Sequence, residues 1–231
     1  MTQVLRNKKK RTVGSKQWLL RNINDEYVKK SKIDGYRSRS AYKLIEINNK
    51  YSIFRPGLRV LDLGAAPGGW SQVASDLIRP KFIGTNQKNN ISDNKLGLVV
   101  AIDLLHMQPL PHTITLQKNF YDENILETVH NLINNEYYDL ILSDMSPNTT
   151  GIKDVDHMRI ITLAEKTFDL ANSLLCPGGS VVCKIFQGGL ENELLSVLKL
   201  QYAQVRHFKP KSSRPESREM YVIATHFRSR H

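Results

Sequence analysis

The chain of 231 residues is long enough for one catalytic domain with an appendage, and such a domain can bury its own core without disulfides or structural metals. It has no apolar run long enough for a membrane span, and its 2 cysteines, Cys176 and Cys183, have no spacing that would bind zinc. The formal net charge of +11 favours a polyanionic partner, and we expect a cytoplasmic protein with no bound metal.

Basic residues are concentrated at the N-terminal end. Residues 1–43 contain 13 Lys and Arg but only 3 Asp and Glu, and four aromatic residues are interleaved with them, namely Trp18, Tyr27, Tyr36 and Tyr42. Cations neutralise phosphates and aromatic rings stack on bases, so this pattern favours RNA or DNA binding over its alternatives, a solvated basic tail or a transit peptide. We predict a basic RNA-binding segment over residues 1–35 and a catalytic domain over residues 36–231.

Apolar periodicity predicts helices and strands that alternate along the chain. A helix over residues 38–51 precedes the turn at Pro56 and Gly57. After it we predict strands at residues 59–63, 99–104, 114–117, 138–143 and 180–186, and helices at residues 70–78, 124–133, 156–175 and 190–200. The polar residues 79–98 have no period and are predicted to form a surface loop. Such alternation indicates a mostly parallel sheet with helices on both faces.

The C-terminal end departs from this alternation. Residues 204–208 and 219–227 are strand-like with no helix between them, so they should pair antiparallel. A mostly parallel α/β sheet that ends in an antiparallel hairpin is typical of class I S-adenosylmethionine-dependent methyltransferases, whereas dehydrogenases have two dinucleotide-binding halves. We therefore expect the Rossmann-like class I methyltransferase fold.

A glycine-rich turn follows the first predicted strand, within residues 60–71, with glycines at Gly64, Gly68 and Gly69. At the carboxyl end of a strand, glycines let the backbone approach a nucleotide-like ligand. A dinucleotide-binding loop would have Gly-x-Gly-x-x-Gly, so a pyrophosphate site is disfavoured. Asp62 suits a ligand with an amino group and a sulfonium. Asp103 ends the next strand, where a carboxylate can accept hydrogen bonds from a ribose diol, although a helix-capping aspartate is the alternative.

Several motifs in the chain together resemble the RrmJ/FtsJ family of ribose 2′-O-methyltransferases. They are Asp62-Leu-Gly-Ala-Ala-Pro-Gly-Gly-Trp70, Ser143-Asp-Met-Ser-Pro-Asn148, Lys184-Ile-Phe-Gln-Gly188, Arg218-Glu-Met-Tyr221 and the RNA-facing Tyr36-Arg-Ser-Arg-Ser-Ala-Tyr-Lys43. The resemblance runs from about Ser15 through Ala224. It implies S-adenosylmethionine as the methyl donor, and the chain looks most like the bacterial enzymes that modify a uridine in large-subunit (23S) ribosomal RNA.

By this resemblance the family's Lys-Asp-Lys-Glu catalytic set falls on Lys43, Asp144, Lys184 and Glu219. A ribose hydroxyl is a poor nucleophile, so its attack requires removal of its proton or stabilisation of its developing negative charge. Lys184 is the candidate, either as a neutral base or as a cation beside a carboxylate that takes the proton. The resemblance implies that Asp144 orients the methionine moiety and Lys184, that Glu219 positions Lys184, and that Lys43 binds RNA. Two surface ion pairs are the alternative interpretation.

The resemblance also implies a set of contacts to S-adenosylmethionine, made by Gly64, Gly68, Gly69, Trp70, Asp103, Asn119 and Asp144. Asn119 stands where the family has an aspartate. An amide can still donate to an adenine ring nitrogen and accept from the adenine amino group, so we expect binding to survive this difference.

Three other functions remain open at this point. Relatives in the family methylate transfer RNA or messenger caps, and the sequence does not choose between these substrates. A non-catalytic RNA-binding ribosome assembly factor is disfavoured, because binding alone does not need a lysine between two carboxylates. A dehydrogenase is disfavoured by the glycine spacing. We expect a monomer that acts on large-subunit ribosomal RNA or on the large ribosomal subunit.

Overall fold

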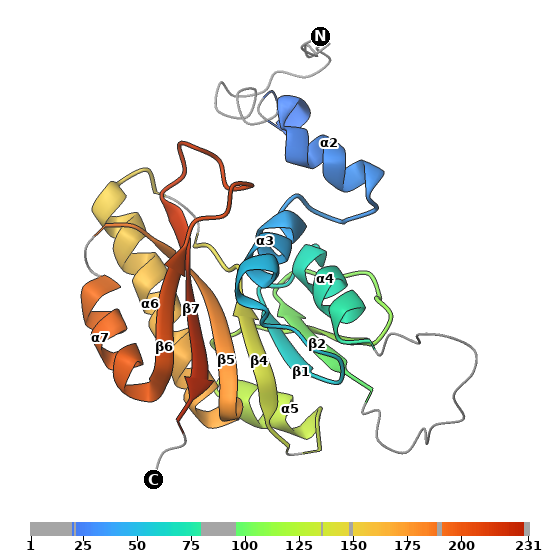
Figure 1. Cartoon of the computed structure of the whole chain (residues 1–231), viewed down its shortest axis with the longest axis vertical. Coiled ribbons are helices and arrows are strands. Elements are labelled where there is room, and N and C mark those ends of the chain that lie inside the picture. The colour runs from blue at the N-terminus through green and yellow to red at the C-terminus, as the bar shows by residue number, and fades with distance from the viewer. Residues whose placement is uncertain are drawn as a thin grey trace.

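The computed structural model describes residues 20, 22–79, 96–134, 136–147, 150–188 and 191–228, which form one central sheet with helices on both faces (Figure 1). The 7 strands have the spatial order β3-β2-β1-β4-β5-β7-β6. Their bounds are β1 (Arg59–Leu63), β2 (Leu98–Asp103), β3 (Thr113–Gln117), β4 (Tyr138–Ser143), β5 (Leu175–Phe186), β6 (Tyr202–Phe208) and β7 (Glu219–Phe227).

The strand pairing is parallel except at the C-terminal end. β1 pairs with β2 and β4, β2 pairs with β3, and β4 pairs with β5, all in parallel. β7 lies between β5 and β6 and is antiparallel to both. The prediction of a mostly parallel α/β sheet with a C-terminal antiparallel hairpin is therefore confirmed.

Six helices are assigned between residues 26 and 201 of the described chain, namely α2 (Glu26–Ile33), α3 (Ala41–Tyr51), α4 (Gly69–Leu77), α5 (Ile125–Asn131), α6 (Lys153–Leu174) and α7 (Glu191–Gln201). α3 and α4 cover one face of the sheet, whereas α5, α6 and α7 cover the other (Figure 1). Among these helices, none has the length and hydrophobicity required to cross a bilayer.

α2 is attached to α3 by aromatic contacts. The Tyr42 ring is 5% exposed, lies 5.4 Å from the Tyr27 ring and 5.7 Å from the Tyr36 ring, and has Lys30 Nζ 4.8 Å above it. The Tyr42 hydroxyl donates a hydrogen bond of 2.8 Å to Asp34. Tyr42 is therefore a packing residue and not a free surface for base stacking, and the predicted stacking residue Trp18 lies outside the described residues.

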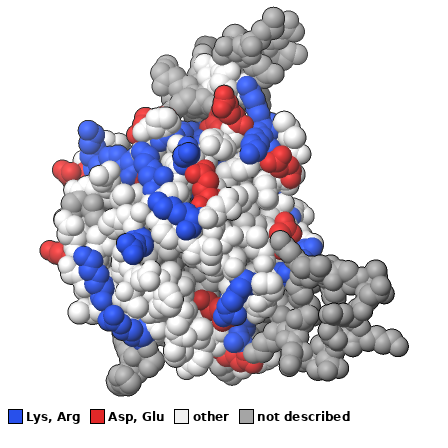
Figure 2. Space-filling model, viewed as in Figure 1, with Lys and Arg blue, Asp and Glu red and all other residues white. Residues whose placement is uncertain are grey.

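Positive charge remains visible on the surface around these helices. Figure 2 shows Lys and Arg side chains over the upper part of the face, where Figure 1 places α2, α3 and the connection between β6 and β7, with some Asp and Glu side chains among them. α2 itself carries Lys30 and Lys32 in its last turn. This part of the surface can attract a polyanion.

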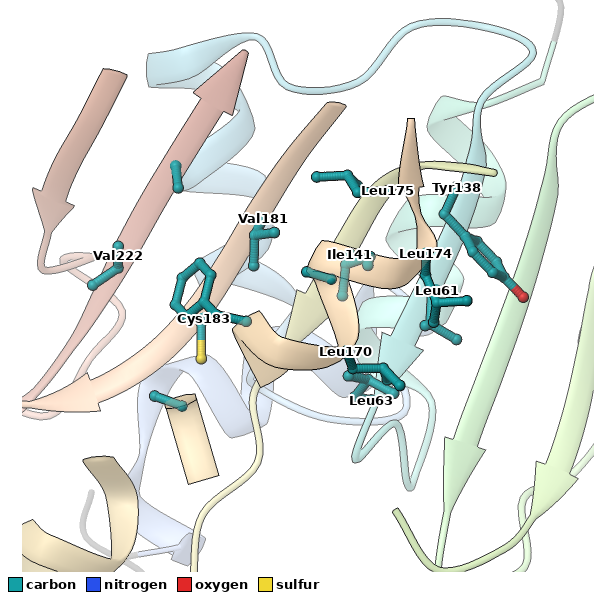
Figure 3. Packing of buried hydrophobic residues seen from close by; sticks show 14 of the residues in the cluster. Leu61, Leu63, Tyr138, Ile141, Leu170, Leu174, Leu175, Val181, Cys183 and Val222 are labelled. Carbon is teal, nitrogen blue, oxygen red and sulfur yellow. The ribbon is translucent and has the colours of Figure 1, made fainter. Parts of the chain in front are cut away.

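Alternating strand residues supply two apolar layers, one on each face of the sheet. Leu61 and Leu63 of β1 belong to the layer under α5, α6 and α7, and Val60 belongs to the layer under α3 and α4. Figure 3 shows part of the first layer, in which Leu170 and Leu174 of α6 approach the sheet. The Cys183 thiol is buried there and free, and burial raises its pKa to about 12, so it is a packing residue rather than a reactive thiol.

Three segments differ from the sequence-based expectations. α2 was not predicted, because its sequence is charge-rich and only Ser31 is buried in it. α6 begins at Lys153 rather than at residue 156, since its first turn is polar and lacks the apolar period. β5 begins at Leu175 within the predicted helix, and its pairing with β4 shifts register across residues 176–179, which include Pro177 and two glycines. Residues 80–95 of the predicted loop lie outside the described residues.

Candidate active site

Two lysines and two carboxylates from distant parts of the chain meet at one end of the sheet. Asp144 follows β4, Lys184 lies near the end of β5, and Glu219 begins β7. Lys43 comes from α3, a helix held on the sheet by its buried Leu44 and Ile47. All four residues that the sequence predicted to be catalytic therefore lie in one cluster, linked by the contacts below.

Lys184 contacts Asp144 at two oxygens. Its Nζ atom lies 2.8 Å from Oδ1 and donates a hydrogen bond of 2.7 Å to the main-chain oxygen of Asp144. Burial acts to raise the pKa of the Asp144 carboxyl, but the charges of Lys184 and Lys43 outweigh burial and lower that pKa below its ordinary value. Asp144 is therefore an ionised acceptor at neutral pH, and it fixes the orientation of Lys184.

A second ion pair joins α3 to β7, with Lys43 Nζ 2.7 Å from Glu219 Oε1. The exposed fractions of the four side chains are 10% for Lys43, 12% for Glu219, 8% for Lys184 and 17% for Asp144, which argues against solvated surface pairs. The resemblance implies that Glu219 positions Lys184, whereas in the structure Glu219 pairs with Lys43. The reason is the register of β7, which places Glu219 opposite Phe186 rather than opposite Lys184.

Tyr221 is a member of this cluster that the sequence analysis did not single out. Its hydroxyl donates a hydrogen bond of 2.6 Å to Asp144 Oδ1, and its ring lies 5.5 Å from the Trp70 ring. Burial and the neighbouring Asp144 carboxylate raise the pKa of Tyr221 well above its ordinary value, so the hydroxyl stays a donor. Tyr221 belongs to the same motif as Glu219, and that motif could have indicated its role. An aromatic residue in an apolar strand is, however, more readily interpreted as a core residue.

A cavity of about 930 Å³ opens beside Asp144, at the carboxyl ends of β1, β2 and β4. Four of the predicted cofactor residues line it, namely Gly64, Asp103, Asn119 and Asp144. Gly64 has a φ of +69°, and a Cβ atom there would lie 2.2 Å from Met145 Cγ, so only glycine fits the turn at this wall of the cavity.

The polar side chains of this cavity have fixed orientations. Asp103 accepts hydrogen bonds from the main-chain N–H groups of Ala66 at 2.9 Å and Leu105 at 2.7 Å. Each carboxylate oxygen can accept a further hydrogen bond, so ribose hydroxyls can still be bound. Asn119 Oδ1 accepts a hydrogen bond of 3.0 Å from the Tyr121 N–H, which orients the Asn119 amide at the cavity wall.

The other three predicted cofactor residues lie against residues 37–40, just before α3, and are not among the residues that line the cavity. A Cβ atom on Gly68 would meet the Arg37 side chain at 3.0 Å, and one on Gly69 would lie 2.1 Å from Ser38 Oγ. Trp70 Nε1 donates a hydrogen bond of 2.9 Å to the Ser40 main-chain oxygen. The glycine-rich turn therefore supports the segment that leads to Lys43.

Asp62 lies behind the same turn. It is 1% exposed and accepts a hydrogen bond of 2.6 Å from the Ser71 hydroxyl. Burial raises the pKa of Asp62 to about 7. By its place in the sequence Asp62 suits a cationic ligand, but it is not part of the cavity lining, and its visible role is to bind the first turn of α4.

Comparison with known proteins identifies the family. The sequence pattern of the FtsJ-like methyltransferases matches residues 36–227. The chain belongs to the FtsJ-like methyltransferase family. The family prediction made from the motifs is confirmed, and the dehydrogenase and the non-catalytic binding module are not favoured.

Individual relatives of this FtsJ-like methyltransferase agree with that assignment. It is 47% identical over 221 residues to the ribosomal RNA large subunit methyltransferase E of Rickettsia akari, covering 95% of this chain and 92% of the relative. It is also 47% identical over 220 residues to the protein of the same name from Rickettsia bellii, with the same coverage. A solved structure described as a ribosomal RNA methyltransferase from Plasmodium falciparum is 28% identical, with a TM-score of 0.71, and covers 84% of this chain and 100% of its own.

The cavity of the FtsJ-like methyltransferase suits a ligand with an apolar ring, a ribose and positive charge. Ile102 and Phe120 supply apolar contact area, while Asp103 and Asp144 supply negative charge. The cavity's Lys118 donates hydrogen bonds of 2.8 Å each to side chains of α5 and its N-terminal cap, so it is already bound within the protein rather than poised for a phosphate. Among the described residues, no three His, Cys, Asp or Glu side chains are grouped as metal ligands.

Proposed function

We propose that this methyltransferase transfers a methyl group from S-adenosylmethionine to a ribose 2′-hydroxyl of large-subunit ribosomal RNA, with a uridine of 23S RNA as the target. One observation carries the proposal. Two oxygens of Asp144 bind the Lys184 Nζ atom, and Asp144 also lines the cavity. The names of the two Rickettsia relatives support the large-subunit RNA as substrate.

S-adenosylmethionine would supply a methyl group on a sulfonium, and the neutral thioether left when the carbon–sulfur bond breaks is a good leaving group. Asp103 would accept hydrogen bonds from its ribose hydroxyls, and Asn119 would contact its adenine. Asp144 would face the positively charged methionine end, where an ionised carboxylate is favourable. The fit rests on the carboxylates and apolar walls of the cavity, which match this ligand better than they match a pyrophosphate.

Lys184 would act on the attacking hydroxyl. The Nζ atom can make three hydrogen bonds, and two of them are directed to Asp144 oxygens. The third can be directed to the substrate hydroxyl. A neutral amine would accept the hydroxyl proton there, and an ammonium would donate to the developing alkoxide. Both use the same geometry, in which Asp144 and Tyr221 prevent the lysine from turning away.

Lys43 and the basic N-terminal segment would bind the RNA. Lys43 is held by Glu219 beside Tyr221, close to the reacting group. Residues 1–35 add positive charge that can neutralise backbone phosphates, ahead of the catalytic domain over residues 36–231. We propose that the protein acts as a monomer in the cytoplasm, where ribosomal RNA is found.

The test is transfer of labelled methyl groups to large subunits, small subunits and transfer RNA from cells that lack the protein. We expect label in the large subunit only, with transfer slowed at least about a hundredfold in Lys184→Ala, although the variant still binds S-adenosylmethionine. Label in transfer RNA alone would instead support the second substrate class of the family. Binding of the methyl donor without transfer to any RNA would contradict the proposal.

A further inference from the structure

The connection between β6 and β7, residues 209–218, is bound by a carboxylate of α3. Glu46 Oε2 accepts a hydrogen bond of 2.6 Å from the Lys211 N–H, and Glu46 Oε1 accepts one of 2.9 Å from the Ser212 N–H. Each oxygen of one carboxylate thus binds one of two successive main-chain N–H groups. Such charge-assisted bonds are stronger than those between neutral groups, so Glu46 binds the connection firmly to α3.

The same helix also contacts the other end of this connection. Glu219 follows it directly and is bound by Lys43, which lies on α3 one turn before Glu46. Residues three apart on a helix lie on the same face, so Lys43 and Glu46 approach the connection side by side. Because α3 is fixed to the sheet through buried Leu44 and Ile47, it provides a rigid base for both contacts.

Other groups bind the same stretch at Ser212. The Arg39 guanidinium donates to the Ser212 main-chain oxygen and pairs with Asp25, the residue that caps α2. Arg214 lies 3.4 Å from the same Asp25 carboxylate. Ser212 is 0% exposed, so the centre of the connection is buried rather than free in solvent. The connection that leads into β7 is therefore bound to α3 and to the residues before it near its centre, while pairing with Phe186 of β5 sets the register of Glu219.

We propose that Glu46 is a positioning residue: by binding the N–H groups of residues 211 and 212 it holds Glu219 in reach of Lys43. This inference rests on the proposed function, in which the pair of Lys43 and Glu219 takes part in binding the RNA beside the reacting group. Glu46 is not among the residues that line the cavity, and we expect its effect on methyl transfer to pass through the connection.

Kinetics of the full-length protein test the proposal. We expect Glu46→Ala to lower kcat for methyl transfer about tenfold, with KM for S-adenosylmethionine within twofold of wild type. Glu46→Gln should fall between, because an amide oxygen can accept only one of the two N–H groups while its NH₂ opposes the other. Glu165→Ala, at an exposed position of α6, is the matched control and should behave as wild type.

Limited proteolysis supplies a readout that does not depend on activity. Trypsin cleaves after Lys and Arg but not before proline. The connection therefore offers the Lys211–Ser212 and Arg218–Glu219 bonds, while the bonds after Lys209 and Arg214 are protected. We expect new chain ends at Ser212 to form about tenfold faster in Glu46→Ala than in wild type or Glu165→Ala. Unchanged cleavage would overturn the proposal.

A double-variant comparison separates positioning from general destabilisation. If Glu46 acts through Glu219, adding Glu46→Ala to Glu219→Ala should change kcat by less than twofold. A full additional tenfold loss, or an equal loss of S-adenosylmethionine binding in Glu46→Ala, would mean that Glu46 supports the whole fold and would overturn the inference. Wild-type protein that transfers no methyl group to any RNA would instead refute the proposed function, and the cleavage rates would still show whether Glu46 holds the connection.

Discussion

Lys184 Nζ lies 2.8 Å from Asp144 Oδ1 and 2.7 Å from the Asp144 main-chain oxygen, so one residue fixes the lysine at two points. Tyr221 donates a hydrogen bond to the same Oδ1 atom. In the register of β5 and β7, Tyr221 lies directly opposite Lys184. The sheet itself thus delivers a lysine, its counter-ion and a donor to that counter-ion at one place.

Replacing Lys184 should abolish chemistry without abolishing donor binding. We expect Lys184→Ala to lower kcat by roughly 10² to 10⁴, the range for loss of a positioned acid, base or charge, with the Kd for S-adenosylmethionine within about threefold. Single-turnover transfer and calorimetry measure the two quantities. Lys184→Arg discriminates the roles, because arginine keeps the positive charge but cannot be a base at neutral pH. Residual activity of Lys184→Arg well above that of Lys184→Ala would assign a cationic role.

Tyr221→Phe removes the hydroxyl that binds Asp144. A hydrogen bond to a charged acceptor contributes about 1.5–3 kcal/mol, and we expect about a tenfold loss in kcat because Asp144 becomes free to reorient. Tyr138→Phe is the control, since its hydroxyl donates a hydrogen bond of 2.9 Å to Val129, away from the cluster. It should lose stability of about 1 kcal/mol and keep its kcat. Equal rates for both variants would show that Tyr221 only packs.

Asp103→Ala should weaken binding of the methyl donor. Its carboxylate lines the cavity and is oriented by two main-chain N–H groups, so the variant loses both that order and the acceptors for two ribose hydroxyls. We expect a Kd increase of about 10- to 100-fold by calorimetry. Asp169→Ala, at an exposed site on α6, should bind as wild type does. An unchanged Kd for Asp103→Ala would place the donor's ribose elsewhere.

The stability of the fold should depend on pH through Asp62. Its pKa is raised from 3.8 to about 7, so between these values the folded chain holds a proton that the unfolded chain has lost. The free energy of unfolding therefore decreases as pH rises through this window. Relative to Asp62→Asn, wild type should lose stability on the order of 4 kcal/mol between pH 4 and pH 8 in urea denaturation. A constant difference between the two proteins would refute the burial effect.

Much of the fold is predictable from the sequence because its strands are continuous apolar runs bounded by polar residues. β4 and β7 have the predicted bounds for this reason. α2 was not predictable, since its helix depends on the Asp25 cap and on packing against Tyr42 rather than on an apolar stripe. The periodic spacing of apolar residues reveals a helix or strand only where one side of it is buried, and in α2 only Ser31 is buried.

The candidate site shows a similar division. The motifs identified Lys43, Asp144, Lys184 and Glu219, which the fold brings together. The partner of Glu219 could not be predicted, because it depends on the register of β7 and on how α3 sits beside that strand. Tyr221 has the sequence features of a core residue, and only its contact with Asp144 reveals a second role.

Identification of the methylated nucleoside would show whether the ribose 2′-hydroxyl is the methyl acceptor. Large-subunit RNA labelled by the wild-type protein would be hydrolysed with alkali, which cleaves only next to a free 2′-hydroxyl, and the products would be separated and identified. We expect all label in one alkali-stable dinucleotide that yields 2′-O-methyluridine. Label on a base, in the mononucleotides that alkali releases, would contradict ribose methylation.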